Sequence, residues 1–288
     1  MPASERNSSA ATAAAAVLAL TMTWSPAAWP DARRVVSLNP CLDTILVNVA
    51  DRDQIAALSH YARDPFSSTI AAIARTLPVT YETAEEIIAL EPDLVLTSRH
   101  SSPATRNALR RMQIRTELFD VPLSVANSIA QIRVVAGLIG RDDRGAELVA
   151  RIDAALAAAA PAAGAAPVTA LIFQRNGFTS GEGTLVDEMM RRTGFVNVAG
   201  RYGYRNWGNI SLERVIADPP QVLLVGEIVP GMPTWADRVL RHPALRHPAL
   251  AIARATFPDR LLYCGGPVLI ESAAALAAAR RGVTEPPS

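Results

Sequence analysis

Residues 124–161, SVANSIAQIRVVAGLIGRDDRGAELVARIDAALAAAAP, form the longest helical pattern in the chain. Apolar residues recur at helical spacing from Ile129 to Ile139, and the pattern resumes at Leu148 and Ile152 after the GRDDRG interruption. Alternating strand and helix patterns precede and follow this tract in the sequence. The tract therefore predicts two lobes joined by a single long helix, which we place at 127–160.

The segment before this helix predicts a first α/β lobe, residues 33–126. Four short apolar runs are the expected strands: RVVSL, IAALSH, PDLVLTSRH and IRTELFDV. They alternate with helical stretches such as YETAEEIIALE. Continuous apolar strands separated by helices are typical of a parallel sheet that is covered on both faces.

A second series predicts the other lobe, residues 167–288, after the linker PAAGAAP. Its expected strands are VTALIFQ, PQVLLVG and DRLLYC (259–264), and its expected helices are TLVDEMMRRTG, SLERVIAD and LIESAAALAAARRG. The fold class is therefore α/β, with two parallel-sheet lobes. In open α/β sheets a ligand lies beyond the carboxyl ends of the strands, so we expect a ligand cleft between the lobes.

The first thirty residues have a different composition from the rest. A polar start, the apolar run AATAAAAVLALTMTW and the small residues of SPAAWPDA are typical of a signal peptide, which we place at 1–27. Exported chains enter an oxidising compartment, where the two cysteines could pair. The alternative is an alanine-rich tail on a cytosolic protein. No later segment has the length and apolarity of a membrane span.

The composition argues against several classes of function. The 28 basic residues, all arginine, balance 27 acidic residues to a net charge of +1 without a basic run, so we expect no nucleic-acid partner. A chain without lysine has no phosphate-binding loop of the usual kind, and the sequence lacks Gly-x-Ser-x-Gly and His-Glu-x-x-His motifs. We therefore do not expect an enzyme.

The loops that follow the expected strands carry the candidate ligand-binding residues. They combine aromatic rings, arginines, histidines and the two cysteines, a set that suits a large, flat or anionic ligand. An alternative is that the histidines are hydrogen-bonded loop residues and that Tyr202, Tyr204 and Trp207 cover the core of the second lobe. The candidates are Cys41, His60, Tyr61, Arg99, His100, Arg175, Phe178, Tyr204, Arg205, Trp207, Glu227 and Cys264.

From about Arg34 to Gly282 the chain resembles the periplasmic substrate-binding proteins of ABC importers for metal chelates. The resemblance rests on the order and spacing of RVVSL, AEEIIALEPDLVLT, GFTSGEGTLVDEMMRRTGFVNVA, ISLERVIADPPQVLLV and YCGGP. It implies a monomer in the periplasm, without a cofactor of its own, that binds a ferric siderophore, haem or cobalamin. It also implies docking on an ABC permease through one acidic residue from each lobe, here Glu85 and Glu213.

The resemblance leaves two chelate classes open. Tyr61, Phe178 and Trp207 match the aromatic lining of cobalamin binders, although Val79 or Tyr81 and Ser98 stand where those proteins have further tryptophans. Arg99, Arg175 and Arg205 could instead clamp the carboxylates or catecholates of a ferric siderophore, because a guanidinium pairs with such groups in a two-pronged way.

Two further hypotheses involve the cysteines. A bare metal ion could be held by Cys41, His60 and His100 with Cys264 or Glu227, or the cysteines could form the reactive pair of a redox enzyme. Cys41 is placed in the loop after the first strand and Cys264 after the last. A disulfide requires the two Cα atoms to lie within about 7 Å, which a cleft that holds a bulky ligand would oppose. We therefore favour free thiols that line the cleft over a disulfide or metal ligation.

Overall fold

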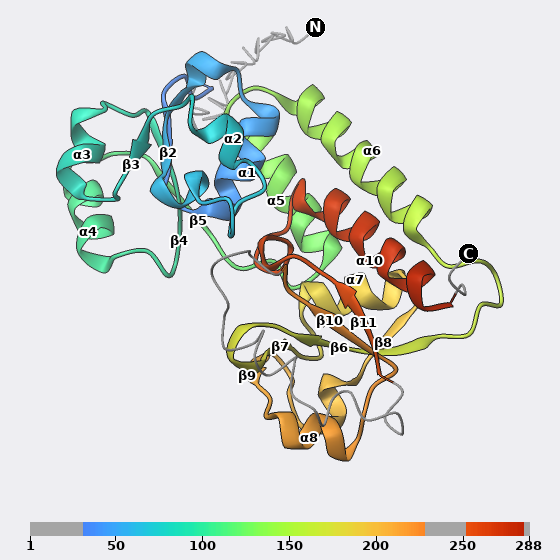
Figure 1. The fold of residues 1–288 in the computed structure, drawn as a ribbon. Coiled ribbons are helices and arrows are strands. Elements are labelled where there is room, and N and C mark those ends of the chain that lie inside the picture. Colours follow the sequence, from blue (N-terminus) through green and yellow to red (C-terminus); the bar gives the residue numbers. More distant parts are fainter. Residues whose placement is uncertain (1–30, 228–251, 285–288) are drawn as a thin grey trace, which may run out of the picture. The chain divides into compact units, whose positions relative to one another are not determined.

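The computed structural model describes residues 31–227 and 252–284, and its first lobe is built on a five-stranded sheet (Figure 1). The strand order is β3-β2-β1-β4-β5, and all neighbouring strands are parallel. Four strands lie where the apolar runs predict them, whereas β3 was not predicted. The strands are β1 (Val35–Ser37), β2 (Ile55–Ser59), β3 (Val79–Thr80), β4 (Leu94–Ser98) and β5 (Thr116–Phe119).

Helix α1 (Pro40–Val49) begins immediately after β1, where the sequence analysis placed a loop. The side chain of Asn39 accepts hydrogen bonds from the backbone N–H groups of Cys41 and Leu42, and Pro40 occupies the first helical turn, where no N–H is needed. Cys41 therefore lies in the first turn of a helix, and its placement in a loop was wrong. The other helices of this lobe are α2 (Ala71–Ala74), α3 (Ala84–Ala89) and α4 (Pro103–Arg111), with the short 3-10 helices η1 (Arg52–Gln54) and η2 (His60–Arg63).

The second lobe has a four-stranded parallel sheet in the order β11-β10-β6-β8. A separate antiparallel pair, β7 and β9, lies beyond the end of β6. The elements are β6 (Val168–Phe173), β7 (Phe178–Ser180), β8 (Phe195–Asn197), β9 (Trp207–Asn209), β10 (Val222–Val225), β11 (Ala253–Thr256), the helices α7 (Leu185–Arg192), α8 (Leu212–Ala217) and α10 (Val268–Thr284), and the 3-10 helices η3 (Arg175–Gly177), η4 (Val198–Tyr202) and η7 (Asp259–Leu261).

The expected strand at 259–264 is wrong, because this segment contains η7. The backbone N–H groups of Leu261 and Leu262 donate to the carbonyls of Pro258 and Asp259, three residues earlier. A short apolar run fits a buried turn as well as it fits a strand, so the sequence pattern could not separate them. The strand that pairs with β10 at this edge of the sheet is β11, which begins six residues earlier in the chain than the predicted strand.

The tract that was expected as one linking helix forms two, α5 (Val125–Leu138) and α6 (Asp142–Ala159). The break falls at Ile139–Arg141, where Gly140 has a φ of +65°, a conformation that glycine adopts readily. Helices α5 and α6 pack against each other, and α6 also packs along α10 (Figure 1). A continuous buried core therefore connects the lobes, from Val35 and Ile132 to Ile152 and Ile172.

No helix in the described ranges, 31–227 and 252–284, is long and apolar enough to cross a membrane. The expected signal peptide at 1–27 lies outside the described residues.

Candidate functional site

The first lobe brings its predicted residues to one edge of the sheet, because the carboxyl ends of parallel strands share an edge. His60 and Tyr61 follow β2, and Arg99 and His100 follow β4. The ring of His60 contacts two tyrosines: its centroid is 3.9 Å from that of Tyr61, with the rings tilted, and 5.0 Å from that of Tyr81, with the rings stacked. This edge of the lobe therefore presents a cluster of three rings, of which those of Tyr61 and Tyr81 are half or more exposed.

The second lobe places Phe178 and Trp207 on the two-stranded sheet. Phe178 opens β7 and Trp207 opens β9, and the two strands pair so that Ser180 lies opposite Trp207. Trp207 is 47% exposed, which is unusual for so large an apolar side chain. Arg175 and Glu227 follow β6 and β10, also at the carboxyl edge of their sheet.

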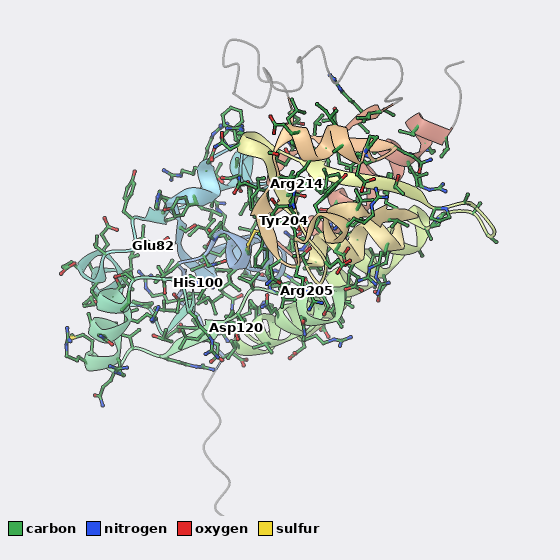
Figure 2. The ribbon with its side chains drawn as sticks, turned by 90° about the horizontal axis from the view of Figure 1, so that it is seen from below. Glu82, His100, Asp120, Tyr204, Arg205 and Arg214 are labelled. Atoms are coloured by element: carbon green, nitrogen blue, oxygen red, sulfur yellow. A yellow bond between two sulfur atoms is a disulfide. The ribbon has the colours of Figure 1, made fainter. Side chains whose placement is uncertain are left out.

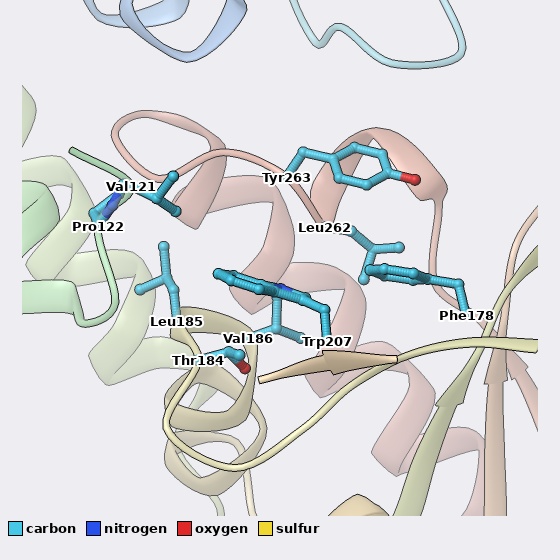
Figure 3. Close-up of a pocket in the computed structure, with 9 residues that line it drawn as sticks. All are labelled: Val121, Pro122, Phe178, Thr184, Leu185, Val186, Trp207, Leu262 and Tyr263. Atoms are coloured by element: carbon cyan, nitrogen blue, oxygen red, sulfur yellow. The ribbon is translucent and has the colours of Figure 1, made fainter. Parts of the chain in front are cut away.

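A pocket of about 300 Å³ lies over these rings (Figure 3). The indole of Trp207 and the ring of Phe178 form one side of it, and the phenol of Tyr263 projects above them. None of the described residues that line it is charged. The lining is completed by Val121, Pro122, Thr184, Leu185, Val186 and Leu262.

A second, smaller pocket continues from the first toward α1. The two pockets share Val121, Pro122 and Tyr263, and the second is also lined by Cys41 and His100. Residues from β4, β5, α1 and the segment before α10 thus line the second pocket, which adjoins the first. Of the twelve predicted ligand-binding residues, the lining of these two pockets includes four: Cys41, His100, Phe178 and Trp207.

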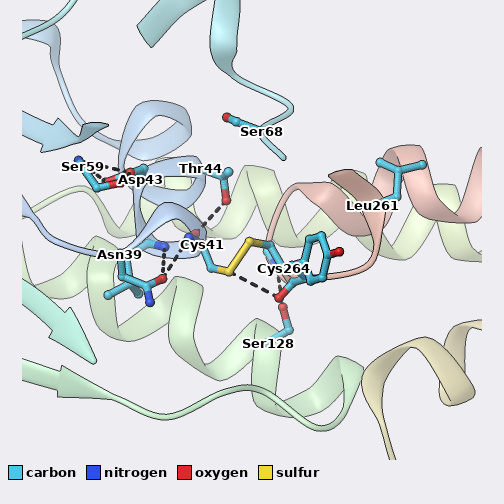
Figure 4. Close-up of a disulfide and its surroundings, with 12 residues drawn as sticks. Asn39, Cys41, Asp43, Thr44, Ser59, Ser68, Ser128, Leu261 and Cys264 are labelled. Carbon is cyan, nitrogen blue, oxygen red and sulfur yellow. Dashed lines mark hydrogen bonds between the residues drawn. A yellow bond between two sulfur atoms is a disulfide. The ribbon is translucent and has the colours of Figure 1, made fainter. Parts of the chain in front are cut away.

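Cys41 and Cys264 form a disulfide, so the expectation of free thiols is wrong (Figure 4). Their Cα atoms are 5.0 Å apart although 223 residues separate them in sequence. The expectation failed because it assumed a ligand between the cysteines. Instead, the segment before α10 lies directly against α1, and the pockets open beside the bond. Disulfide sulfurs are not available as thiolate ligands for a bare metal ion.

Two of the three predicted arginines, Arg99 and Arg175, are engaged in ion pairs within their own lobes, and so is Glu227. Arg99 pairs with Asp120 at 2.5 Å, and Arg175 pairs with Asp259 at 3.0 Å. Arg260 pairs with Glu227 at 2.7 Å. These residues therefore do not present an open set of cations to the pockets.

Tyr204 packs against the core of the second lobe. Its hydroxyl donates to the carbonyl of Asn209 at 2.7 Å, and its ring packs beside the buried cluster that contains Tyr202. The alternative that these tyrosines cover the core is confirmed for Tyr202 and Tyr204 but not for Trp207. Arg205 is exposed in the turn before β9, and Figure 2 shows Tyr204 and Arg205 on the second lobe and His100 and Asp120 on the first.

Within the described ranges, no group of three or more His, Cys, Asp or Glu side chains could hold a metal ion. The bare-ion hypothesis required Cys41 with His60 and His100, and the disulfide removes its first ligand.

The family model for periplasmic binding proteins matches residues 35–253. This chain belongs to that family. The cobalamin-binding protein of Halobacterium salinarum is 24% identical to this periplasmic binding protein over 198 residues, which are 67% of this chain and 53% of that protein. The match therefore spans about half the length of its curated relatives.

Two solved structures of the same fold are informative. The haem-binding protein RhuT from Roseiflexus sp. RS-1, in its apo form, has 26% identity and a TM-score of 0.68, and the match covers 86% of this chain and 98% of RhuT. The vitamin B12 binding protein BtuF of Vibrio cholerae has 18% identity and a TM-score of 0.65, with coverages of 88% and 99%. Both likenesses show the two-lobed fold of periplasmic binding proteins.

The two glutamates that the resemblance assigns to docking lie in the first turns of short helices. Glu85 is exposed in α3, while its neighbour Glu86 accepts hydrogen bonds from the Thr80 hydroxyl and the Tyr81 N–H. Glu213 is exposed at the start of α8 in the other lobe. Each lobe of this periplasmic binding protein thus presents one of the two residues at its surface.

Asp43 is a buried carboxyl outside the set of predicted ligand-binding residues. It lies in the first turn of α1 and is fully buried. Burial raises its pKa to about 7, with a small further rise from the charge of Glu82, although hydrogen bonds from the Ser37 and Ser59 hydroxyls oppose the change. Its hydrogen bonds with Ser59 join α1 to β2, so it supports the edge that carries His60.

Sequence reasoning missed Tyr263 and the aliphatic residues Val121, Pro122, Leu185 and Leu262. Tyr263 precedes Cys264, but its segment was read as a strand, which hid its position at the pocket. The exposed aromatic residues offered a signal. All large exposed aromatics in the described ranges follow the carboxyl ends of strands or line the pocket: Tyr61, Phe66, Tyr81, Trp207 and Tyr263.

Proposed function

We propose that this periplasmic binding protein captures a bulky, flat metal chelate of the corrinoid class and delivers it to an ABC permease. The observation that carries the proposal is the uncharged pocket that is lined by the exposed rings of Trp207 and Tyr263 and the partly buried ring of Phe178. Exposed aromatic faces in a concave site favour a ligand with a large, weakly polar surface. The cobalamin-binding relative supports the same class of ligand.

The charge pattern favours a corrinoid over a ferric siderophore. A siderophore with carboxylate or catecholate groups calls for available guanidinium groups. Arg99 and Arg175 instead pair with Asp120 and Asp259. A macrocycle with neutral amide groups at its edge makes no such demand, because amides bind to hydroxyl and backbone groups without a counter-charge.

Export and docking complete the proposed cycle. The segment 1–27 directs the chain to the periplasm, where the loaded monomer meets the membrane permease. Glu85 and Glu213 then pair with basic residues of that permease, one from each lobe. Two contacts made together hold the protein better than either alone, since single exposed ion pairs contribute little.

A thermal-shift panel tests the ligand class. The purified chain is mixed with cyanocobalamin, hemin, a ferric hydroxamate or a divalent metal ion alone, and unfolding is followed for each mixture. We expect cyanocobalamin to raise the unfolding temperature most, because a ligand that binds only the folded state stabilises it. A larger rise with the ferric hydroxamate would overturn the corrinoid assignment, and no rise with any chelate would overturn the function.

A further inference from the structure

We propose that Tyr263 is a specificity-determining residue of the chelate pocket and that the Cys41–Cys264 disulfide positions it. This inference rests on the function proposed above. Tyr263 lines both adjacent pockets and is 52% exposed, although it is the immediate neighbour of a buried cysteine. It therefore stands at the junction of the pocket over Trp207 and the pocket beside α1.

The backbone on the carboxyl side of Tyr263 is held tightly against two helices. Cys264 is bonded to Cys41 in α1, and the N–H of Gly266 donates to the hydroxyl of Ser128 in α5. These contacts come from elements far away in sequence. They leave the backbone of this segment little freedom to move away from α1.

The two glycines of YCGGP permit this close approach. A Cβ atom on Gly265 would lie 2.4 Å from the hydroxyl oxygen of Ser128, and one on Gly266 would lie 2.8 Å from Cγ1 of Ile45. Gly266 also has a φ of +63°, which disfavours any side chain. The motif therefore serves to seat this segment on α1 and α5.

The phenol ring of Tyr263 has two features that suit a chelate. Its centroid is 6.3 Å from that of Phe178 with the planes 48° apart, so the two rings form a corner of the pocket. Burial, and the charge of Asp259, raise the pKa of its hydroxyl, which stays protonated at neutral pH. The ring can thus contact a flat ligand while the hydroxyl donates to an oxygen at the ligand's edge.

A double-mutant cycle tests the positioning role. The affinity for cyanocobalamin is measured for the wild type, Tyr263→Ala, Cys41→Ser/Cys264→Ser and the triple variant. Tyr263→Ala is expected to weaken binding about tenfold or more, a change typical of a buried aromatic contact. If the disulfide acts through Tyr263, breaking it weakens the wild type but has little further effect on Tyr263→Ala. A disulfide that merely stabilises the fold would give additive losses, which would overturn the positioning role.

Matched variants keep the test decisive. Tyr263→Phe keeps the ring and should retain most of the affinity, while Met112→Ala, an exposed apolar residue before the amino end of β5, should leave it unchanged. Should the serine variants fail to fold, mild reduction of the native protein replaces them in the cycle. Unchanged binding by Tyr263→Ala, in a chain that binds cyanocobalamin, overturns the inference alone. A wild type that binds none of the chelates in the thermal-shift panel overturns the proposed function, and the inference with it.

Discussion

The hydroxyl of Ser59 lies 2.5 Å from Oδ2 of Asp43, and the Ser59 N–H also donates to this carboxyl. The pair joins α1 to the end of β2, directly before His60 and Tyr61 in the chain. Because the carboxyl is fully buried, its pKa in the folded chain is about 7, against 3.8 for an ordinary aspartate.

The first prediction concerns the pH dependence of stability. A raised pKa means that the folded chain binds the proton more tightly than the unfolded chain. The stabilising contribution is thus full below about pH 4 and is lost as the pH rises through about 7. Asp43→Asn has no carboxyl to ionise and should not show this loss. The free energy of unfolding of the variant, relative to that of the wild type, should therefore rise between pH 4 and pH 8, on the order of a few kcal/mol.

Denaturant unfolding at several pH values measures this difference. Asp153→Asn, at an exposed position of α6, is the control and should keep the pH profile of the wild type. Parallel profiles for Asp43→Asn and the wild type would show that the carboxyl does not titrate in this range.

The second prediction concerns the disulfide as a stabilising cross-link. Cys41→Ser/Cys264→Ser should lower the free energy of unfolding by about 2–4 kcal/mol, because the bond restricts the unfolded chain. A reducing agent should lower the stability of the wild type by a similar amount and leave the variant unchanged. Equal stability of the oxidised and reduced wild type would contradict the prediction.

The third prediction concerns Trp207. Its indole is 47% exposed and lines the pocket, so Trp207→Ala should weaken chelate binding about tenfold or more while changing stability little. Isothermal titration compares this variant with Met112→Ala, which removes an exposed apolar side chain elsewhere. Equal losses of affinity in both variants would argue against a specific role for the indole.

The fourth prediction separates the two chelate classes through Arg175. Because Arg175 pairs with Asp259, Arg175→Gln should change the affinity for a corrinoid by less than about threefold, as expected for the loss of a partly exposed ion pair. Arg99→Gln, which breaks the pair with Asp120, should behave in the same way. A tenfold loss in either variant would instead indicate an anionic ligand held by arginine.

The fifth prediction concerns docking. Reversing charge with Glu85→Arg or Glu213→Arg should weaken binding to the reconstituted permease and leave chelate affinity unchanged, and the double variant should weaken permease binding further. Glu147→Arg, at an exposed position of α6, is the control. The affinity of each variant is measured on permease that is immobilised on a surface. Unaltered binding of the double variant would exclude these residues as contacts.

Much of the architecture was predictable from apolar runs. β1, β2, β4, β6 and β10 lie at short apolar runs, because a strand that is buried on both faces has to be continuously apolar. The edge strand β5 was also predicted, although it is only partly buried. The run at 259–264 was misread for the same reason. The apolar residues of that segment are explained by burial alone. The local hydrogen bonds that make the segment a turn do not affect the sequence pattern.

The site was less predictable than the fold. Phe178 and Trp207 were found because aromatic residues in polar loops are rare enough to notice. The disulfide and Tyr263 were missed because both depend on how closely two distant segments approach. The glycines of YCGGP allow that approach, yet a glycine pair by itself predicts only a turn.

The central claim, capture of a flat chelate by an aromatic pocket, is tested most directly by titrating cyanocobalamin into the purified chain in a calorimeter at several temperatures. The account predicts saturable binding at one site with a negative heat-capacity change, because apolar surface is removed from water. Absence of saturable binding, or binding without a change in heat capacity, would contradict it.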